Sequence, residues 1–196
     1  YGDSREIGAT VRALVAVGSA GMNLEDGAAV RKNEPRRLVD ITEQLEKIAA
    51  VMTAKRELGS DFFLNARVDA FLVSADDQKR VLAAAIRRGN LYAEAGADCI
   101  FFLHIEEREI IGRLAREIKA PVSILAGLEC PGVRELQDLG VARVSYGSAF
   151  TRAAIGAVKR LAVEIRDSGS IAALKDAISS QDMKTLVSRG RAVFSS

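Results

Sequence analysis

The chain has 196 residues, of which 48% are hydrophobic, and its 28 basic and 26 acidic residues leave a net charge of +2. This length and hydrophobic content suffice for one domain with a buried core. The balanced charge, without a dense basic stripe, gives no support to nucleic-acid binding. No apolar stretch approaches the roughly 20 residues that span a membrane. The two cysteines make no disulfide framework, so we expect a cytoplasmic protein.

Helical and strand patterns alternate along the whole chain. Apolar residues at helical spacing predict helices at 4–17, 39–57, 76–94, 110–118, 131–139, 154–165, 170–178 and 181–193. Short apolar runs between them predict strands at 21–25, 62–66, 99–103, 122–126 and 142–146. The polar segment 26–37 contains Pro35 and predicts a loop, and Gly59 is placed to end the second helix.

The predicted strands are apolar throughout, which is typical of a parallel sheet covered on both faces. The strand–helix order fits two α/β architectures, an open doubly wound sheet and a (β/α)8 TIM-type barrel. Five strands cannot close an ordinary barrel, whereas a preceding part with three strands would complete eight. The chain opens with Tyr1 rather than methionine, and we interpret this as a missing N-terminal part.

Charged side chains follow the first two predicted strands. Glu25 and Asp26 end the first, and Arg67 follows the second. Ligands bind at the carboxyl ends of parallel strands, where two acids suit a divalent cation and an arginine suits a carboxylate or phosphate. The residues leave alternatives open. The two acids also fit an ordinary strand end, and Arg67 also fits a structural ion pair with Asp69 or Glu25.

Two segments carry most of a resemblance to a known family, Asn23-Leu24-Glu25-Asp26 and Asn65-Ala66-Arg67-Val68-Asp69-Ala70. Further matching segments lie at 1–3, 96–98, 121–127 and 140–148. In their order and spacing these segments resemble the isocitrate lyase and phosphoenolpyruvate mutase superfamily. The resemblance runs nearly end to end, and it is specific for the superfamily rather than for one reaction.

The resemblance implies a (β/α)8 barrel, of which this chain is the part from about strand 4 to strand 8 plus the C-terminal helices. On this reading 1–196 is a single barrel domain, and helices within 170–196 are exchanged between the subunits of a homo-oligomer, a dimer or a tetramer. It also implies Mg²⁺, with Mn²⁺ as a substitute, and a small 2-oxo acid or dicarboxylate as substrate.

The resemblance also assigns roles to residues of this chain. Glu25 and Asp26 are the expected metal site, with Asp26 alternatively orienting the loop or the metal waters. Arg67 and Glu25 are the expected catalytic residues, and Arg67 grips the substrate carboxylate or phosphate. The remaining substrate-binding residues expected are Asn65, His104 and Ser123. For His104, a surface loop position without a role in the site is the alternative.

Three departures from the family pattern narrow the function. The family's metal-binding aspartates lie just before Tyr1, loop 27–36 lacks the cysteine and histidine of the lyases, and Ser123 replaces a common asparagine. We therefore expect no cleavage of isocitrate or methylisocitrate. The predicted function is a Mg²⁺-dependent lyase-like or mutase-like enzyme that breaks or rearranges a C–C or P–C bond through an enolate-type intermediate. The alternative is a non-catalytic or truncated barrel with a structural or oligomerisation role.

Overall fold

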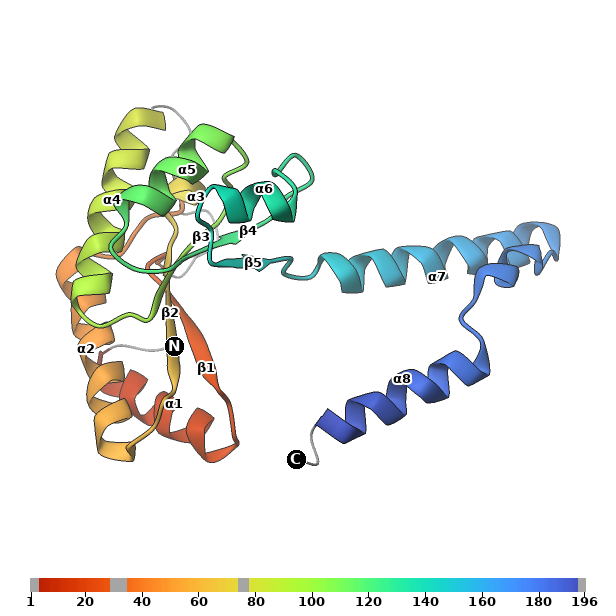
Figure 1. The fold of residues 1–196 in the computed structure, drawn as a ribbon, viewed down its shortest axis with the longest axis horizontal. Helices are drawn as coiled ribbons and strands as arrows, with labels where there is room; N and C mark the ends of the chain where they lie inside the picture. Colours follow the sequence, from red (N-terminus) through yellow and green to blue (C-terminus); the bar gives the residue numbers. More distant parts are fainter. Residues whose placement is uncertain (1–3, 29–34, 74–77, 194–196) are drawn as a thin grey trace. The chain divides into compact units, whose positions relative to one another are not determined.

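The computed structural model describes residues 4–28, 35–73 and 78–193, and it divides into two compact units, 1–146 and 147–196. The first unit contains a five-stranded parallel sheet in the order β1-β2-β3-β4-β5 (Figure 1). Its strands are β1 (Gly21–Glu25), β2 (Phe63–Val68), β3 (Cys99–Phe102), β4 (Val122–Leu125) and β5 (Arg143–Ser145).

The strand order decides between the two predicted architectures. Each strand pairs in parallel with the strand that precedes it in the chain. A doubly wound sheet reverses its strand order at a switch point, and the described sheet contains no such reversal. The α/β prediction is therefore confirmed, and the sheet has the sequential winding of a (β/α) barrel.

The helices of the first unit follow the predicted alternation. They are α1 (Ser4–Ala16), α2 (Ile41–Leu58), α3 (Ala70–Val73), α4 (Gln78–Glu94), α5 (Arg108–Glu117) and α6 (Val133–Asp138). The Asp40 side chain caps α2 by accepting a hydrogen bond from the Thr42 N–H at 2.8 Å. Gly59 ends α2 with a positive φ of 56°, as predicted from its position.

One face of the sheet packs against the helices and forms the core. Alternate strand residues contribute Leu64, Ala66, Val68, Ile100, Phe102, Val122 and Ile124. Tyr92 and Ile48 fill this core from the helices. On the opposite face Phe63 is 43% exposed and Asn23 is also exposed. On the same face Asn65 is only 2% exposed, so within the described residues this face of β1 and β2 is covered in part.

Some predicted boundaries shift in ways that affect the site. β2 extends beyond the predicted residue 66, so Arg67 lies inside the strand, opposite Glu25 of β1 and Phe101 of β3. The four-residue helix α3 is too short to show a period, and the sequence does not predict it. The predicted helix start at 76 falls within 74–77, outside the described residues, and the described part of that helix begins at Gln78.

The predicted loop 26–37 is held at its base. The Ala28 N–H donates to the Arg37 carbonyl at 2.8 Å, and the Val39 N–H donates to the Asp26 carbonyl at 2.9 Å. An isolated bridge between Gly27 and Leu38 completes this antiparallel contact. Residues 29–34 of the predicted loop lie outside the described residues.

The second unit consists of α7 (Ala149–Ser168), the 3-10 helix η1 (Ala172–Asp176) and α8 (Ser180–Val193). Its described part exposes many large apolar side chains: Phe150, Ile155, Val158, Ile171, Leu174, Ile178, Met183, Leu186 and Val187. Exchange of these helices between subunits stays a prediction. No described helix is long and apolar enough to cross a membrane.

Gly21→Ala should destabilise the first unit, because a Cβ at Gly21 would lie 2.4 Å from the backbone carbonyl oxygen of Phe63. A backbone atom of a paired strand cannot move without disturbing β1–β2 pairing, so we expect a loss of roughly 1–3 kcal/mol. Urea denaturation measures it. Gly132→Ala is the matched control, since a Cβ there meets no atom within 4 Å. Equal effects of the two substitutions would contradict the steric argument.

Candidate functional site

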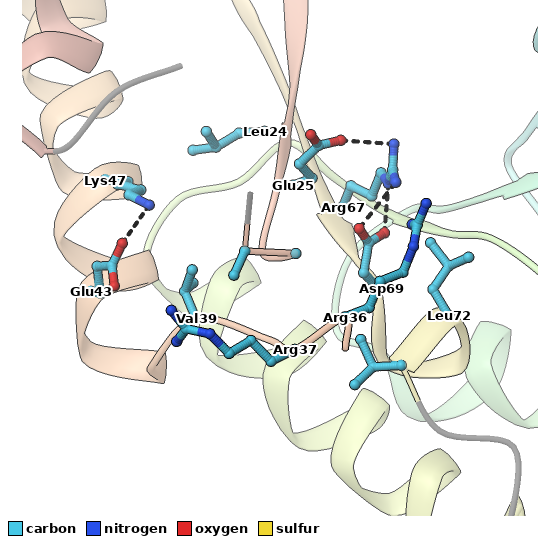
Figure 2. A pocket seen from close by; sticks show the side chains of 13 residues that line it. Leu24, Glu25, Arg36, Arg37, Val39, Glu43, Lys47, Arg67, Asp69 and Leu72 are labelled. Carbon is cyan, nitrogen blue, oxygen red and sulfur yellow. Dashed lines mark hydrogen bonds and ion pairs between the residues drawn. The ribbon is translucent and has the colours of Figure 1, made fainter. Parts of the chain in front are cut away.

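A pocket of about 680 Å³ opens at the carboxyl ends of β1 and β2. Figure 2 shows its charged side chains, with Glu25, Arg67 and Asp69 on one side and Glu43 and Lys47 on α2. The described residues that line it are Leu24, Glu25, Gly27, Ala28, Arg36, Arg37, Val39, Glu43, Lys47, Arg67, Asp69, Leu72 and Val73. The pocket lies where the sequence places a ligand, and it contains Glu25 and Arg67 of the predicted site.

Arg67 is held from two sides by carboxylates. Its Nε and Nη2 donate to Asp69 Oδ1 and Oδ2 at 2.6 and 3.0 Å, which is a bidentate pairing. Its Nη1 lies 2.8 Å from Glu25 Oε2. The ion pairs with Asp69 and Glu25, considered as the alternative role of Arg67, are therefore both present.

These contacts still leave Arg67 able to bind an anion. A guanidinium has five N–H groups. Among the described residues, Asp69 and Glu25 together occupy three of them in Arg67, which leaves two for a ligand. The side chain is 21% exposed and lines the pocket. Burial lowers the pKa of Arg67, but the hydrogen bond and charge of Asp69 and the charge of Glu25 outweigh it and raise the pKa above its ordinary value. Arg67 is thus a fixed, permanently charged donor.

Asp26 points away from the pocket into a buried network. Its Oδ1 accepts from the Asp69 N–H at 2.7 Å, and its Oδ2 accepts from Tyr92 Oη at 2.8 Å and from Arg88 Nη1 at 3.1 Å. The residue is 0% exposed, and burial raises its pKa against the lowering effect of these three donors. Since both oxygens accept hydrogen bonds from the chain, the geometry supports a structural role over metal ligation.

The other predicted substrate-binding residues do not line this pocket. Asn65 donates through Nδ2 to Asn23 Oδ1 at 2.7 Å, and Asn65 Oδ1 and Ser123 Oγ are buried without a hydrogen-bond partner within the described part. Both residues lie on the sheet face opposite the helices. His104 follows β3, is exposed, and is the one non-glycine residue with positive φ (56°) in the described chain. Their substrate-binding roles stay predictions.

Sequence reasoning missed several residues that build the pocket and its support. Arg36, Arg37, Glu43 and Lys47 line the pocket, and Glu43 and Lys47 form an i,i+4 pair at 2.6 Å. The i,i+4 spacing of Glu43 and Lys47 in the sequence is typical of a helix-surface ion pair. Arg88 and Tyr92 have the same spacing on α4, but no sequence signal connects them with Asp26, more than 60 residues away.

The described residues do not by themselves form a complete metal site. No group of three histidine, cysteine, aspartate or glutamate side chains among them could hold a metal ion. The Glu25 side chain is 40% exposed and borders the pocket. Mg²⁺ is commonly bound by one or two carboxylates together with waters and substrate oxygens, so Glu25 fits as one ligand, directly or through water.

The cysteines show no sign of activation. Burial raises the pKa of the Cys99 thiol to about 11, and burial also raises the pKa of Cys130. Thiolate nucleophiles need a lowered pKa. Burial therefore disfavours the thiolate at both positions.

Several proteins with related sequences or structures are enzymes. Phosphonopyruvate hydrolase of Variovorax sp. is 30% identical over 182 residues, covering 87% of this chain and 60% of that protein. The structure of phosphoenolpyruvate phosphomutase from Streptomyces platensis subsp. rosaceus matches with a TM-score of 0.79 and 26% identity, over 100% of this chain and 68% of that one. A phosphonopyruvate hydrolase complex with oxalate and Mg²⁺ matches with a TM-score of 0.76 and 28% identity, over 97% of this chain and 66% of that one.

The chain spans about three fifths of the length of the curated relatives it matches first. The described sheet is accordingly part of a TIM-type (β/α) barrel, as the sequence predicts. A family model for phosphoenolpyruvate phosphomutase matches residues 1–166. The chain therefore belongs to the phosphoenolpyruvate phosphomutase family, within the isocitrate lyase and phosphoenolpyruvate mutase superfamily.

Proposed function

We propose that the protein is a Mg²⁺-dependent enzyme that acts on a small 2-oxo acid or dicarboxylate. It breaks or rearranges a C–C or P–C bond through an enolate-type intermediate. The observation that carries the proposal is Arg67, which is fixed by two carboxylates and borders a pocket of about 680 Å³ beside Glu25. Lyases and mutases among the relatives support the same class of reaction.

Each of the two residues has a distinct task in this proposal. Arg67 presents its remaining N–H groups to a carboxylate or phosphonate of the substrate and so orients the bond that breaks. Glu25 is the carboxylate ligand, direct or through water, for Mg²⁺. Bound Mg²⁺ supplies positive charge beside the substrate oxygens, where negative charge develops. Glu25 also fixes Arg67 through their 2.8 Å ion pair. This contact holds the metal ligand and the anion-binding guanidinium at a constant distance from each other.

A purely structural barrel remains the second candidate function, and one observation favours it. The contacts of Arg67 with Glu25 and Asp69 neutralise its charge without any ligand. A structural ion pair of this kind needs no substrate. The two candidates differ in what they require of Glu25, because only the enzyme needs it to serve a metal ion.

The assembly and location of the protein are further proposals. The apolar residues exposed on α7 and α8 fit burial against a second copy, in a dimer or tetramer that exchanges its C-terminal helices. We propose a cytoplasmic protein with a small carboxylate as its ligand, and without nucleic-acid or membrane partners.

Glu25→Gln should weaken Mn²⁺ binding to the full-length protein, because a neutral amide replaces a charged oxygen ligand or water acceptor. We expect a loss of about ten-fold or more, measured by electron paramagnetic resonance titration with Mn²⁺ as the Mg²⁺ substitute. Glu43→Gln is the matched control: it makes the same chemical change in the same pocket, at a residue paired with Lys47.

The control should keep the wild-type Mn²⁺ affinity. If folded Glu25→Gln protein also keeps the wild-type Mn²⁺ affinity, Glu25 is no metal ligand. That result would favour the purely structural barrel over the enzyme. Equal weakening by both substitutions would show a general effect of pocket charge rather than ligation.

A further inference from the structure

A charged pair lies buried behind the pocket, where it takes no part in lining it. Arg88 projects from α4, and its side chain is 12% exposed, while the Asp26 carboxylate that it contacts at 3.1 Å is 0% exposed. Tyr92, one turn further along α4, accepts from Arg88 Nη1 at 2.9 Å and donates to Asp26 Oδ2 at 2.8 Å. The three polar groups form a closed triangle that ties α4 to the end of β1.

Asp26 also connects this triangle with the end of β2 through two hydrogen bonds. Its second oxygen, Oδ1, accepts the Asp69 backbone N–H at 2.7 Å. The Asp26 N–H also donates to the Arg67 carbonyl at 3.0 Å. The backbone on both sides of residue 68 is therefore fixed by Asp26, and Asp26 in turn is fixed by Arg88 and Tyr92.

The Asp69 carboxylate then holds the guanidinium that faces the pocket. Asp69 is 4% exposed and grips Arg67 with both oxygens. Gly27 makes room for it, since a Cβ at that position would lie 2.5 Å from Asp69 Oδ2. A shift of the Asp69 backbone thus moves the Arg67 head group directly.

Arg88 has a second attachment, to the backbone at Val39. Its Nη2 donates to the Val39 carbonyl at 3.0 Å, and the Val39 N–H donates to the Asp26 carbonyl. One guanidinium thereby joins the base of loop 26–37 to the end of β1. A buried ion pair often adds little stability over apolar residues of similar volume, whereas this planar fork fixes directions that apolar packing would not.

We propose that Arg88, assisted by Tyr92, is a positioning residue that sets the place of the Arg67 guanidinium through Asp26 and Asp69. The chain of contacts starts in the helical layer and ends at the pocket. Arg88 itself touches no ligand in this scheme. The inference rests on the proposed function only in its last step, the binding of an anion by Arg67.

The first test follows Arg67 directly by nuclear magnetic resonance of the arginine Nε–H groups in the full-length protein. The Arg67 signal is assigned by its loss in Arg67→Lys. In Arg88→Gln, and more mildly in Tyr92→Phe, hydrogen exchange at this Nε–H should accelerate about ten-fold or more, because the Asp69 contact opens more often. Arg87→Gln is the matched control, since it removes the same charge from the neighbouring exposed position of α4.

The second test measures oxalate affinity in the presence of Mg²⁺ by calorimetry, with melting temperature as the measure of folding. We expect about ten-fold weaker binding in Arg88→Gln, as for other residues that orient a ligand-binding group, with partial recovery in Arg88→Lys. Arg87→Gln should bind as the wild type does. Oxalate affinity is compared at temperatures where the melting curves show every variant fully folded. The weaker binding of Arg88→Gln should still be present there.

Wild-type Nε–H exchange of Arg67 in folded Arg88→Gln would overturn the proposal. If Arg88→Gln does not fold, Tyr92→Phe decides, since it removes one hydroxyl and leaves the ion pair. If Arg67→Lys itself leaves oxalate affinity unchanged, the proposed function fails, and the exchange measurement still decides whether Arg88 positions Arg67.

Discussion

Asp26→Ala should lower the free energy of unfolding by about 3–5 kcal/mol, the usual cost of removing one partner of a buried ion pair. The substitution leaves the Arg88 guanidinium, 12% exposed, without its counter-ion. It also removes the acceptor of the Tyr92 hydroxyl and of the Asp69 N–H. Unsatisfied buried donors add to the loss. Urea denaturation, monitored by circular dichroism, measures the change.

The control for Asp26→Ala is Asp61→Ala, which removes a carboxylate from an exposed position just before β2. It should have little effect, as most surface substitutions do. The double variant Asp26→Ala with Arg88→Ala should lose less than the sum of the two single losses, because the residues share one contact. Additive losses would show that Asp26 and Arg88 do not interact.

Arg67→Lys should weaken oxalate binding to the full-length protein about ten- to a hundred-fold. Lysine keeps the charge but lacks the planar fork, and losing a charge-assisted hydrogen bond costs about 1.5–3 kcal/mol. Calorimetric titration measures the affinity. Arg37→Lys is the matched control, since Arg37 lines the same pocket as an exposed side chain, and it should change the affinity little.

Arg67→Ala separates the two roles of this arginine. The buried Asp69 carboxylate would lose its bidentate partner, so the free energy of unfolding should fall by several kcal/mol. If Arg67 also binds the substrate, oxalate affinity falls in both Arg67 variants under conditions where they are folded. A large fall in melting temperature together with intact oxalate binding would contradict the substrate-binding role.

Much of the site could be predicted from the sequence, because it depends on local pattern. Alternating apolar runs and helical spacing place the strands and helices. Parallel strands bring their carboxyl ends to one edge, and this alone predicts that Glu25 and Arg67 lie close together. Their 2.8 Å contact and opposite positions in β1 and β2 confirm that part.

One further feature of the site follows from the strand pattern of the sequence. Neighbouring residues at the end of a strand point to opposite sides. Glu25 accordingly faces the pocket, and Asp26 turns into the network with Arg88 and Tyr92. This alternation predicts different surroundings for Glu25 and Asp26, and the metal role of Asp26 stays a prediction.

Three features of the fold and the site depend on the tertiary structure alone. The sequential strand order, rather than a doubly wound one, follows from long-range pairing that local periodicity does not encode. The Arg67 guanidinium contacts both Asp69 and Glu25, and this pairing depends on how far β2 extends past residue 66. The attachment of Asp26 to Arg88 joins residues 62 positions apart. Such contacts are fixed when helices pack on the sheet, because burial forces each charged group to find a partner from another element.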